Sequence, residues 1–338
     1  MMNKVIIIAE AGVNHNGSVQ LACQLIDAAK EAGADYVKFQ TFIPGLLVSK
    51  EAKQAEYQQK NSGEASQHDM LKELALTYDQ FQLLFDYCKE RNIGFLSTGF
   101  DEKSVKFIDS LGVDYHKVPS GEITNLPYLK FIGSLKKKVI LSTGMSTMQE
   151  VKEAFDILTD AGTKPGDIVV LQCTTEYPAP FDEVNLLAMR TMAETLKVQT
   201  GFSDHTQGIE IPVAAVALGA TVIEKHFTLD REMPGPDHRA SLEPGELASM
   251  VRAIRNVEVS LGDGVKRPAP SEVKNIKAAR RSIHTAKALS SGHIIMEEDL
   301  VMKRPGHGIS PMLVKEITGK RLTKDLPEDW MLNESDFS

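Results

Sequence analysis

The chain has 338 residues, of which 42% are hydrophobic and 25% are charged. These fractions are average for a globular protein, and they exclude a disordered, fibrous or membrane-spanning chain. Its 38 basic and 46 acidic residues give a net charge of −8, and neither sign forms a long block. The sequence therefore carries no electrostatic footprint for nucleic acid, and an anionic substrate would need a local basic pocket.

The N-terminus and the cysteines predict a cytoplasmic protein that does not bind membranes. The apolar run before Glu10 is too short for the core of a signal peptide, and no stretch approaches the ~20 apolar residues that span a bilayer. The cysteines, Cys23, Cys88 and Cys173, are widely spaced. Such spacing is typical of reduced thiols that are buried as small hydrophobic residues.

Short runs rich in Val, Ile, Leu and Phe recur along the first two thirds of the chain. They begin at Val5, Tyr36, Gly94, Tyr115, Val139, Ile168, Thr200 and Val222. Amphipathic stretches with helical spacing separate most of them, such as residues 19–34 and 104–112, and often end at Gly as helix C-caps do. Eight such units in about 260 residues predict a (β/α)₈ barrel, with an open doubly wound sheet as the alternative.

The pattern changes after the eight units, which occupy residues 1–265. Residues 266–281 are rich in Pro, Gly and charge, and predict a linker that ends in a polar helix near 274–281. From 282 to 338 short strand-like pieces alternate with turns, which predicts a small second domain that leans on a partner surface. Residues 42–70 predict an inserted loop over the strand ends, either a substrate lid or a surface excursion.

Nearly every predicted strand ends in polar residues, and strand ends are where a barrel places its reactive groups. Lys38 and Lys117 extend from apolar strands, and hydroxyl groups accompany them at Thr98, Ser120, Ser142 and Ser203. Fixed cations neutralise a dianion and hydroxyl groups donate to its oxygens, so this set suits a phosphate together with a carboxylate. A Schiff-base role for Lys117 is the alternative.

Two histidines end the last two predicted strands. Because these strands are neighbours in a closed barrel, the imidazoles of His205 and His226 are expected to meet above it. Two imidazoles completed by oxygens of substrate and water describe a labile divalent-metal site, suited to Mn²⁺, Mg²⁺ or Co²⁺. Glu122, after the fourth strand, is the best-placed carboxylate for proton transfer. Glu10 and Glu224 are alternatives, expected to bind substrate hydroxyls or to orient the groups around the metal.

Specific motifs stand in a fixed order along almost the whole chain. They are AEAGVNHNGS, VKFQTF, FLSTGFD, HKVPSGEITNLPYLK, VILSTGM, CTTEYPAPFDEVNL, GFSDHT and VIEKHFTLDREMPGPDHRASLEP. Together they resemble the sialic acid synthase family. The tail SIHTAKALSSGHIIMEEDLVMKRPGHGISP resembles the antifreeze-like (SAF) domain that closes these synthases.

The resemblance implies condensation of phosphoenolpyruvate (PEP) with an open-chain N-acetylated hexosamine, with C–O cleavage and release of phosphate. It assigns PEP binding to Lys38, Thr98, Lys117, Ser120, Ser142, Asn185 and Ser203. It assigns the sugar to Glu10, Gln40, Tyr177 and Asp237, and a divalent metal, Mn²⁺ first, to His205 and His226. Glu122 matches the glutamate that takes the proton of the attacking water.

The resemblance also implies an assembly and a product class. Arg304 resembles an arginine that reaches the N-acetyl group of the sugar in the partner subunit's barrel, which implies a domain-swapped homodimer. The motifs fit N-acetylneuraminate made from N-acetylmannosamine, or N,N′-diacetyllegionaminate made from 2,4-diacetamido-2,4,6-trideoxymannose, and do not separate them. Alternatives are another PEP-dependent aldol synthase, of the pseudaminate or octulosonate-phosphate type, and a non-catalytic sugar-binding protein. Gly99 stands where many relatives carry Pro.

Overall fold

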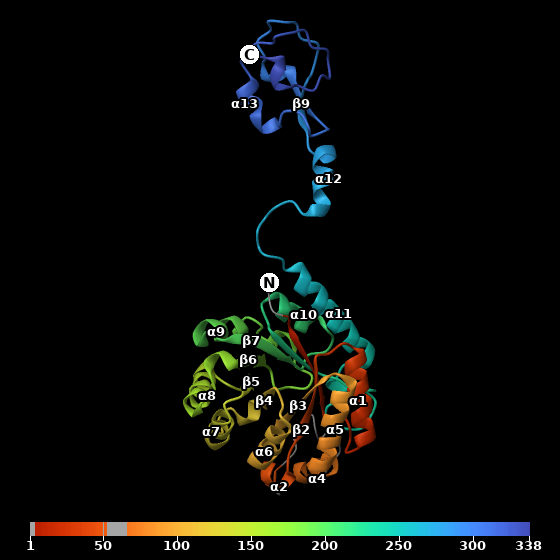
Figure 1. Ribbon diagram of the computed structural model, residues 1–338, viewed down its shortest axis with the longest axis vertical. Helices are drawn as coiled ribbons and strands as arrows, with labels where there is room; N and C mark the ends of the chain where they lie inside the picture. Colours follow the sequence, from red (N-terminus) through yellow and green to blue (C-terminus); the bar gives the residue numbers. More distant parts are fainter. Residues whose placement is uncertain (1–3, 50, 53–65) are drawn as a thin grey trace. The chain divides into compact units, whose positions relative to one another are not determined.

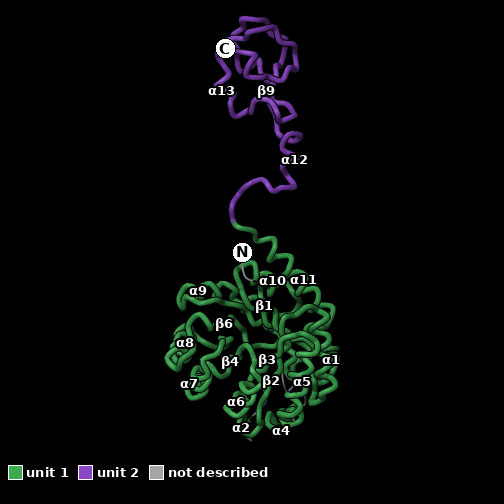
Figure 2. The backbone as a smooth tube through the Cα atoms, viewed as in Figure 1, with its two compact units in different colours: residues 1–263 green, residues 264–338 purple. Residues whose placement is uncertain are grey.

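The computed structural model describes residues 4–49, 51–52 and 66–338, and the chain divides into two compact units, 1–263 and 264–338 (Figure 2). In the first unit the strands β1 to β8 are parallel and close into a barrel in chain order, which confirms the predicted (β/α)₈ fold (Figure 1). The strands are β1 (Ile6–Gly12), β2 (Tyr36–Thr41), β3 (Gly94–Gly99), β4 (Tyr115–Val118), β5 (Lys138–Ser142), β6 (Ile168–Cys173), β7 (Gln199–Asp204) and β8 (Val222–His226).

Helices alternate with these strands and cover the outside of the barrel (Figure 1). They are α1 (Val19–Glu31), α5 (Tyr78–Arg91), α6 (Glu102–Leu111), α7 (Leu126–Ser134), α8 (Met148–Ala161), α9 (Ala188–Leu196), α10 (Glu210–Ala217) and α11 (Pro244–Ser260). The predicted insertion at 42–70 contributes α2 (Pro44–Leu47) and the start of α4 (Gln67–Leu74), while its residues 50 and 53–65 lie outside the described residues. No helix of the described chain is both long and apolar enough to cross a bilayer.

Side chains at the helix ends satisfy the backbone groups that a helix leaves unpaired. Thr77 Oγ1 accepts from Gln80 N at 3.2 Å, and Thr77 N donates to Gln80 Oε1 at 2.8 Å, a reciprocal cap that starts α5. Gly112 ends α6 with φ +79°, a left-handed conformation that glycine adopts without steric cost. The C-cap predicted at this glycine is confirmed.

The interior of the barrel is filled by apolar side chains toward the N-terminal ends of the strands. Successive residues of a strand face opposite sides, so every second residue points into the barrel. The interior residues at this end are Ile8, Leu96, Ile140, Val169, Leu171 and Val222. The intervening strand residues, such as Phe39 and Phe202, form an apolar layer under the helices together with Phe81 of α5 and with Phe227. The next inward-facing residues along each strand line the carboxyl-terminal end of the barrel.

Gly99 ends β3 where α6 approaches closely. A Cβ at this position would lie 2.8 Å from Val105 Cγ2 and 2.9 Å from Val105 N. The Gly99 carbonyl accepts a hydrogen bond from Tyr128 Oη at 2.5 Å. The glycine therefore matches a tight contact between strand and helices, and Thr98 before it still faces the interior.

The second unit has its own small core. Its elements are α12 (Pro270–Ala279), β9 (Ser282–Thr285), β10 (Leu300–Lys303) and α13 (Val314–Ile317), with β9 antiparallel to β10. The helix predicted near 274–281 begins instead at Pro270, because proline suits a first helical turn and Glu272 Oε2 accepts from Ala269 N at 2.8 Å. The core residues are Ile283, Leu289, Ile295, Ile317, Leu322, Leu326 and Leu332.

Candidate active site

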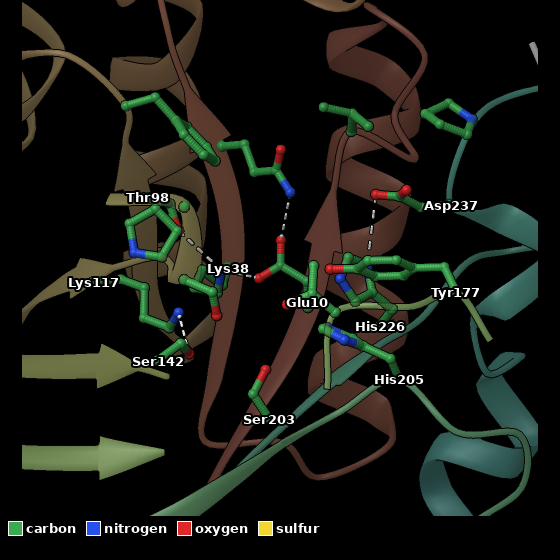
Figure 3. Close-up of a pocket in the computed structure, with 18 of the residues that line it drawn as sticks. Glu10, Lys38, Thr98, Lys117, Ser142, Tyr177, Ser203, His205, His226 and Asp237 are labelled. Carbon is green, nitrogen blue, oxygen red and sulfur yellow. Dashed lines mark hydrogen bonds and ion pairs between the residues drawn. The ribbon is translucent and has the colours of Figure 1, made fainter. Parts of the chain in front are cut away.

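A cavity of about 360 Å³ lies at the carboxyl ends of the barrel strands (Figure 3). Its polar lining follows from the alternation of the strands. Glu10 lies two residues beyond the interior Ile8, and Glu224 lies two residues beyond Val222. The apolar side chains that fill the N-terminal end of the barrel therefore lie directly beneath the polar residues of the cavity.

The cavity brings together most of the predicted site residues. These are Glu10, Lys38, Gln40, Thr98, Lys117, Ser120, Ser142, Tyr177, Ser203, His205, His226 and Asp237. Figure 3 shows the labelled members of this set converging from different strands. The convergence is a property of the closed barrel, because these residues are far apart in the sequence.

Three predicted residues do not line this cavity. Asn185 is exposed, has φ +49°, and lines a second cavity beside α8 and α9, which shares Met145, Cys173 and Thr175 with the first. Glu122 lies in a short 3₁₀ helix after β4, and its carboxylate accepts a hydrogen bond from Asn125 Nδ2 at 2.6 Å. Arg304 belongs to the second unit, is exposed, and donates from Nε to the Ala279 carbonyl at 3.0 Å.

Lys38 is held between two buried carboxylates. Its Nζ contacts Glu10, lies 3.6 Å from Glu224 Oε2, and donates to Thr98 Oγ1 at 3.0 Å. Gln40 Nε2 donates to the other Glu10 oxygen at 3.5 Å. The Lys38 ammonium group is therefore surrounded by oxygen acceptors from Glu10, Glu224 and Thr98 at the base of the cavity.

Lys117 makes the matching contacts on the opposite side of Glu224. Its Nζ donates to Ser142 Oγ at 2.8 Å and lies 3.6 Å from Glu224 Oε1. Ser203 Oγ donates to the same Glu224 oxygen at 3.0 Å. Burial lowers the pKa of Lys117, so the Schiff-base alternative for this residue stays open.

The two buried glutamates have opposite protonation tendencies. Burial raises the pKa of Glu10 to about 7, although Lys38 pulls it down. Burial also pushes the pKa of Glu224 upward, but Lys117 and Lys38 and the Ser203 hydrogen bond outweigh it, so that pKa lies below its ordinary value. The charged form is therefore favoured more strongly at Glu224 than at Glu10.

His205 and His226 lie side by side, with ring centroids 5.5 Å apart. His205 Nδ1 donates to the Thr174 carbonyl at 2.7 Å, and the Tyr177 ring lies 4.1 Å from the His205 ring. His226 Nδ1 is buried without a hydrogen-bond partner in the described residues, and Asp237 Oδ2 is 3.8 Å away. Burial lowers the pKa of His226 well below its ordinary value, so its ring is neutral.

A buried neutral imidazole nitrogen without a hydrogen-bond partner suits a metal ligand, and the pair of histidines fits a divalent ion. The described residues contain no group of three or more His, Cys, Asp or Glu side chains that would hold an ion. The fit therefore rests on His205 and His226 themselves.

Several lining residues were not among the predicted site residues. Cys173 is buried and free as predicted, but its Sγ also lines the cavity, 3.8 Å from His205 Nδ1. It lies two residues beyond the interior Leu171, so strand alternation would have identified it. Thr175 lines the cavity with a buried Oγ1 that has no partner in the described chain. An apolar wall is formed by Val13, Leu47, Val48, Met70, Leu71, Leu74 and Phe100. Val13 and Phe100 lie within the AEAGVNHNGS and FLSTGFD motifs but were not assigned to the site, and the other five lie outside the motifs.

Comparison with known proteins identifies the class to which this barrel and cavity belong. The NeuB family model matches residues 25–266, and the SAF domain model matches residues 280–338. The chain belongs to the NeuB family and carries a C-terminal SAF domain, as the sequence predicted. It is therefore an enzyme of the NeuB type.

Individual relatives are similar over almost their full length. The chain is 50% identical over 334 residues to an N,N′-diacetyllegionaminic acid synthase of Campylobacter jejuni subsp. jejuni, covering 98% of this chain and 100% of that protein. A Legionella pneumophila protein of the same name is 49% identical, covering 95% and 91%. The crystal structure of the N-acetylneuraminic acid (sialic acid) synthetase from Leptospira borgpetersenii has a TM-score of 0.70 and 34% identity, covering 81% and 90%.

Replacing Lys38 by Met is expected to lower the free energy of unfolding by about 3–5 kcal/mol, because Glu10 and Glu224 lose their shared cation while buried. Urea denaturation followed by circular dichroism measures the change. Lys38→Met combined with Glu10→Gln is expected to recover part of the loss. The control Lys106→Met removes an exposed pair with Glu102 and should cost under about 1 kcal/mol. Equal losses in both single variants would contradict the buried network.

Proposed function

We propose that the enzyme condenses PEP with 2,4-diacetamido-2,4,6-trideoxymannose and releases phosphate and N,N′-diacetyllegionaminate. The observation that carries the proposal is the cavity that combines two buried lysines, hydroxyl donors and a pair of histidines. The identities of 50% and 49% to two proteins named N,N′-diacetyllegionaminic acid synthase support this product. The solved N-acetylneuraminic acid synthetase, at 34%, makes N-acetylmannosamine the second candidate acceptor.

The apolar wall supports the same choice of acceptor. It consists of Val13, Leu47, Val48, Met70, Leu71, Leu74 and Phe100. The proposed acceptor has a methyl group at C6 and a second acetamido group at C4, where N-acetylmannosamine has hydroxyl groups. Burying an apolar carbon gains about 0.8 kcal/mol, whereas a hydroxyl group buried against such a wall loses its hydrogen bonds to water. The wall therefore favours the deoxygenated, diacetylated sugar.

PEP binding uses the cations at the base of the cavity. Lys38 and Lys117 neutralise its phosphate and carboxylate, and Thr98, Ser120, Ser142 and Ser203 supply hydroxyl groups. Glu224 holds the two ammonium groups apart on either side of its carboxylate. Protonation of Glu10 as the anion enters leaves Lys38 available to pair with the substrate. Thr175, which lines both this cavity and the one that Asn185 lines, offers a further hydroxyl group.

The acceptor binds beside the histidines in this proposal. His205 and His226 hold a divalent ion, Mn²⁺ in preference to Mg²⁺ or Co²⁺, which when bound supplies Lewis-acid polarisation of the acceptor aldehyde. The Thr174 carbonyl and the Tyr177 ring fix the orientation of His205. Glu10, Gln40 and Asp237 accept from or donate to the hydroxyl groups of the open-chain sugar.

Glu122 completes the reaction by accepting a proton. After the carbon–carbon bond forms, water adds to the former C2 of PEP, Glu122 takes its proton, and collapse of the tetrahedral centre expels phosphate. Ser120 and Gly121, which precede Glu122 on the same 3₁₀ helix, line the cavity. Glu122 therefore directly follows two residues of the cavity lining, and in this proposal exchange of its Asn125 hydrogen bond for one to water brings its carboxylate into use.

Phosphate release from PEP with Mn²⁺ and a panel of acceptors tests the proposed reaction. We expect 2,4-diacetamido-2,4,6-trideoxymannose to exceed N-acetylmannosamine in kcat/KM by about tenfold or more, since the two differ in methyl, hydroxyl and acetyl groups that face a wall. Arabinose 5-phosphate should release none. A preference for N-acetylmannosamine would reassign the product. No release with any acceptor in metal-replete enzyme would exclude the synthase.

Glu122→Gln is expected to keep PEP affinity but to lower kcat by about 10²–10⁴-fold, because the amide cannot accept the proton of water. Isothermal titration gives the PEP affinity and the phosphate assay gives kcat. Glu102→Gln, an exposed residue of α6, is the matched control and should retain full activity. A normal kcat for Glu122→Gln would remove Glu122 from the mechanism.

Arg304 is proposed to reach the sugar in the barrel of a second copy, giving a domain-swapped homodimer. Arg304→Ala and His205→Ala proteins should each be inactive alone. Mixed after subunit exchange, they should recover about a quarter of wild-type activity, because half of the dimers are hybrids with one intact site. Phosphate release measures recovery, and mass spectrometry of differently labelled subunits verifies exchange. Exchange without recovery would count against the swapped arrangement.

A further inference from the structure

Lys225 is a fully buried lysine that the proposed mechanism does not use. Its exposed fraction is 0%, and so is that of Asp204 on the neighbouring strand. Because Glu224 and His226 on either side of it line the cavity, Lys225 points outward into the layer between the barrel and its helices. Burial of a charge is costly, so its retention behind the site calls for a specific interaction.

The ammonium group of Lys225 joins the two residues that flank His205. Its Nζ contacts Asp204 Oδ2 at 2.5 Å and donates to the Thr206 carbonyl. Asp204 in turn accepts from Thr206 N at 2.9 Å and from Thr206 Oγ1 at 3.1 Å. A single side chain of β8 therefore bonds to the Asp204 carboxylate on one side of the first histidine and to the Thr206 carbonyl on the other, and it lies directly before the second histidine.

The backbone ladder stops where this side-chain network begins. Strand β7 ends at Asp204, which pairs with Lys225 in the last register position of β7 and β8. His205 lies one residue beyond the ladder, so strand pairing does not set its separation from His226. The Thr174 carbonyl orients the His205 ring, but this bond comes from a different strand end and does not tie His205 to β8.

We propose that Asp204, Lys225 and Thr206 are positioning residues that hold the His205 and His226 imidazoles at the separation needed to bind one divalent ion. The inference rests on the metal site of the proposed function. The three residues lie on the outer face of the barrel wall and act through the two histidines, without contact to substrate. Partners behind metal ligands typically change metal affinity about 10–100-fold when they are removed.

The double variant Asp204→Leu/Lys225→Met tests the network in the full-length protein. It removes both charges at similar side-chain volume, a replacement that buried ion pairs often tolerate without loss of folding. Free Mn²⁺, measured by electron paramagnetic resonance, gives the Kd, and thermal unfolding of the metal-free protein gives the stability. We expect the Mn²⁺ Kd to rise about tenfold or more while the metal-free protein still unfolds cooperatively.

A second ion pair provides the matched control. Arg255 Nη2 lies 2.7 Å from Asp35 Oδ2 near the opposite end of the barrel, where Asp35 also accepts from Ile7 N. Asp35→Leu/Arg255→Met is expected to lower stability and to leave the Mn²⁺ Kd unchanged. An equal rise of the Kd in both double variants would indicate general loosening and would overturn the inference.

The remaining outcomes separate this inference from the proposed function. An unchanged Kd in a folded Asp204→Leu/Lys225→Met protein overturns the positioning network and leaves the metal site intact. Failure of wild-type protein to bind Mn²⁺ in a His205-dependent manner overturns both. If the double variant does not fold, Thr206→Val removes one bond of the network. A rise of a few fold in its Kd supports the inference, and an unchanged value overturns it.

Discussion

The charge on which the cavity depends is the buried carboxylate of Glu224. It lies 3.6 Å from the ammonium groups of both Lys38 and Lys117 and accepts a hydrogen bond from Ser203. Without it, Lys117 would lose its carboxylate partner and Lys38 would keep only Glu10, in a barrel interior where charges are weakly screened. Glu224, the carboxylate shared by both lysines, therefore allows two cations to lie close together in the barrel interior of a protein whose net charge is −8.

This arrangement needs a rigid support, which the barrel provides in two layers. Apolar side chains fill the N-terminal end of the interior, so the inward residues that follow them are held at fixed heights. On the outer face, Lys225 of the last ladder pair extends the link between β7 and β8 to the Thr206 carbonyl, beyond the end of the ladder. Glu224 and Lys225 are consecutive residues of β8, and Ser203 and Asp204 are consecutive residues of β7, so these inner and outer groups are supported by the same two strands.

Much of this was accessible from the sequence because parallel barrels have a simple period. The eight strands and the polar strand ends followed from hydrophobic runs and alternation. Residues on irregular segments were harder to place: Asn185 has a left-handed backbone after β6, and Glu122 bonds to Asn125 on a 3₁₀ turn. The apolar wall was not predicted from the sequence, because two of its members, Leu47 and Leu74, reach the cavity only through the tertiary placement of the segment between β2 and α5. Local sequence does not encode such contacts.

The apolar wall has a consequence for how such enzymes diverge. The charged residues that would receive PEP belong to barrel strands, whereas most of the apolar wall belongs to the segments between β2 and α5 and after β3. Substitutions in these segments alter the surface offered to the acceptor without moving Lys38, Lys117 or Glu224. In the reaction proposed above, loop residues alone can therefore change which acceptor sugar is favoured, while the charged residues on the strands stay in place.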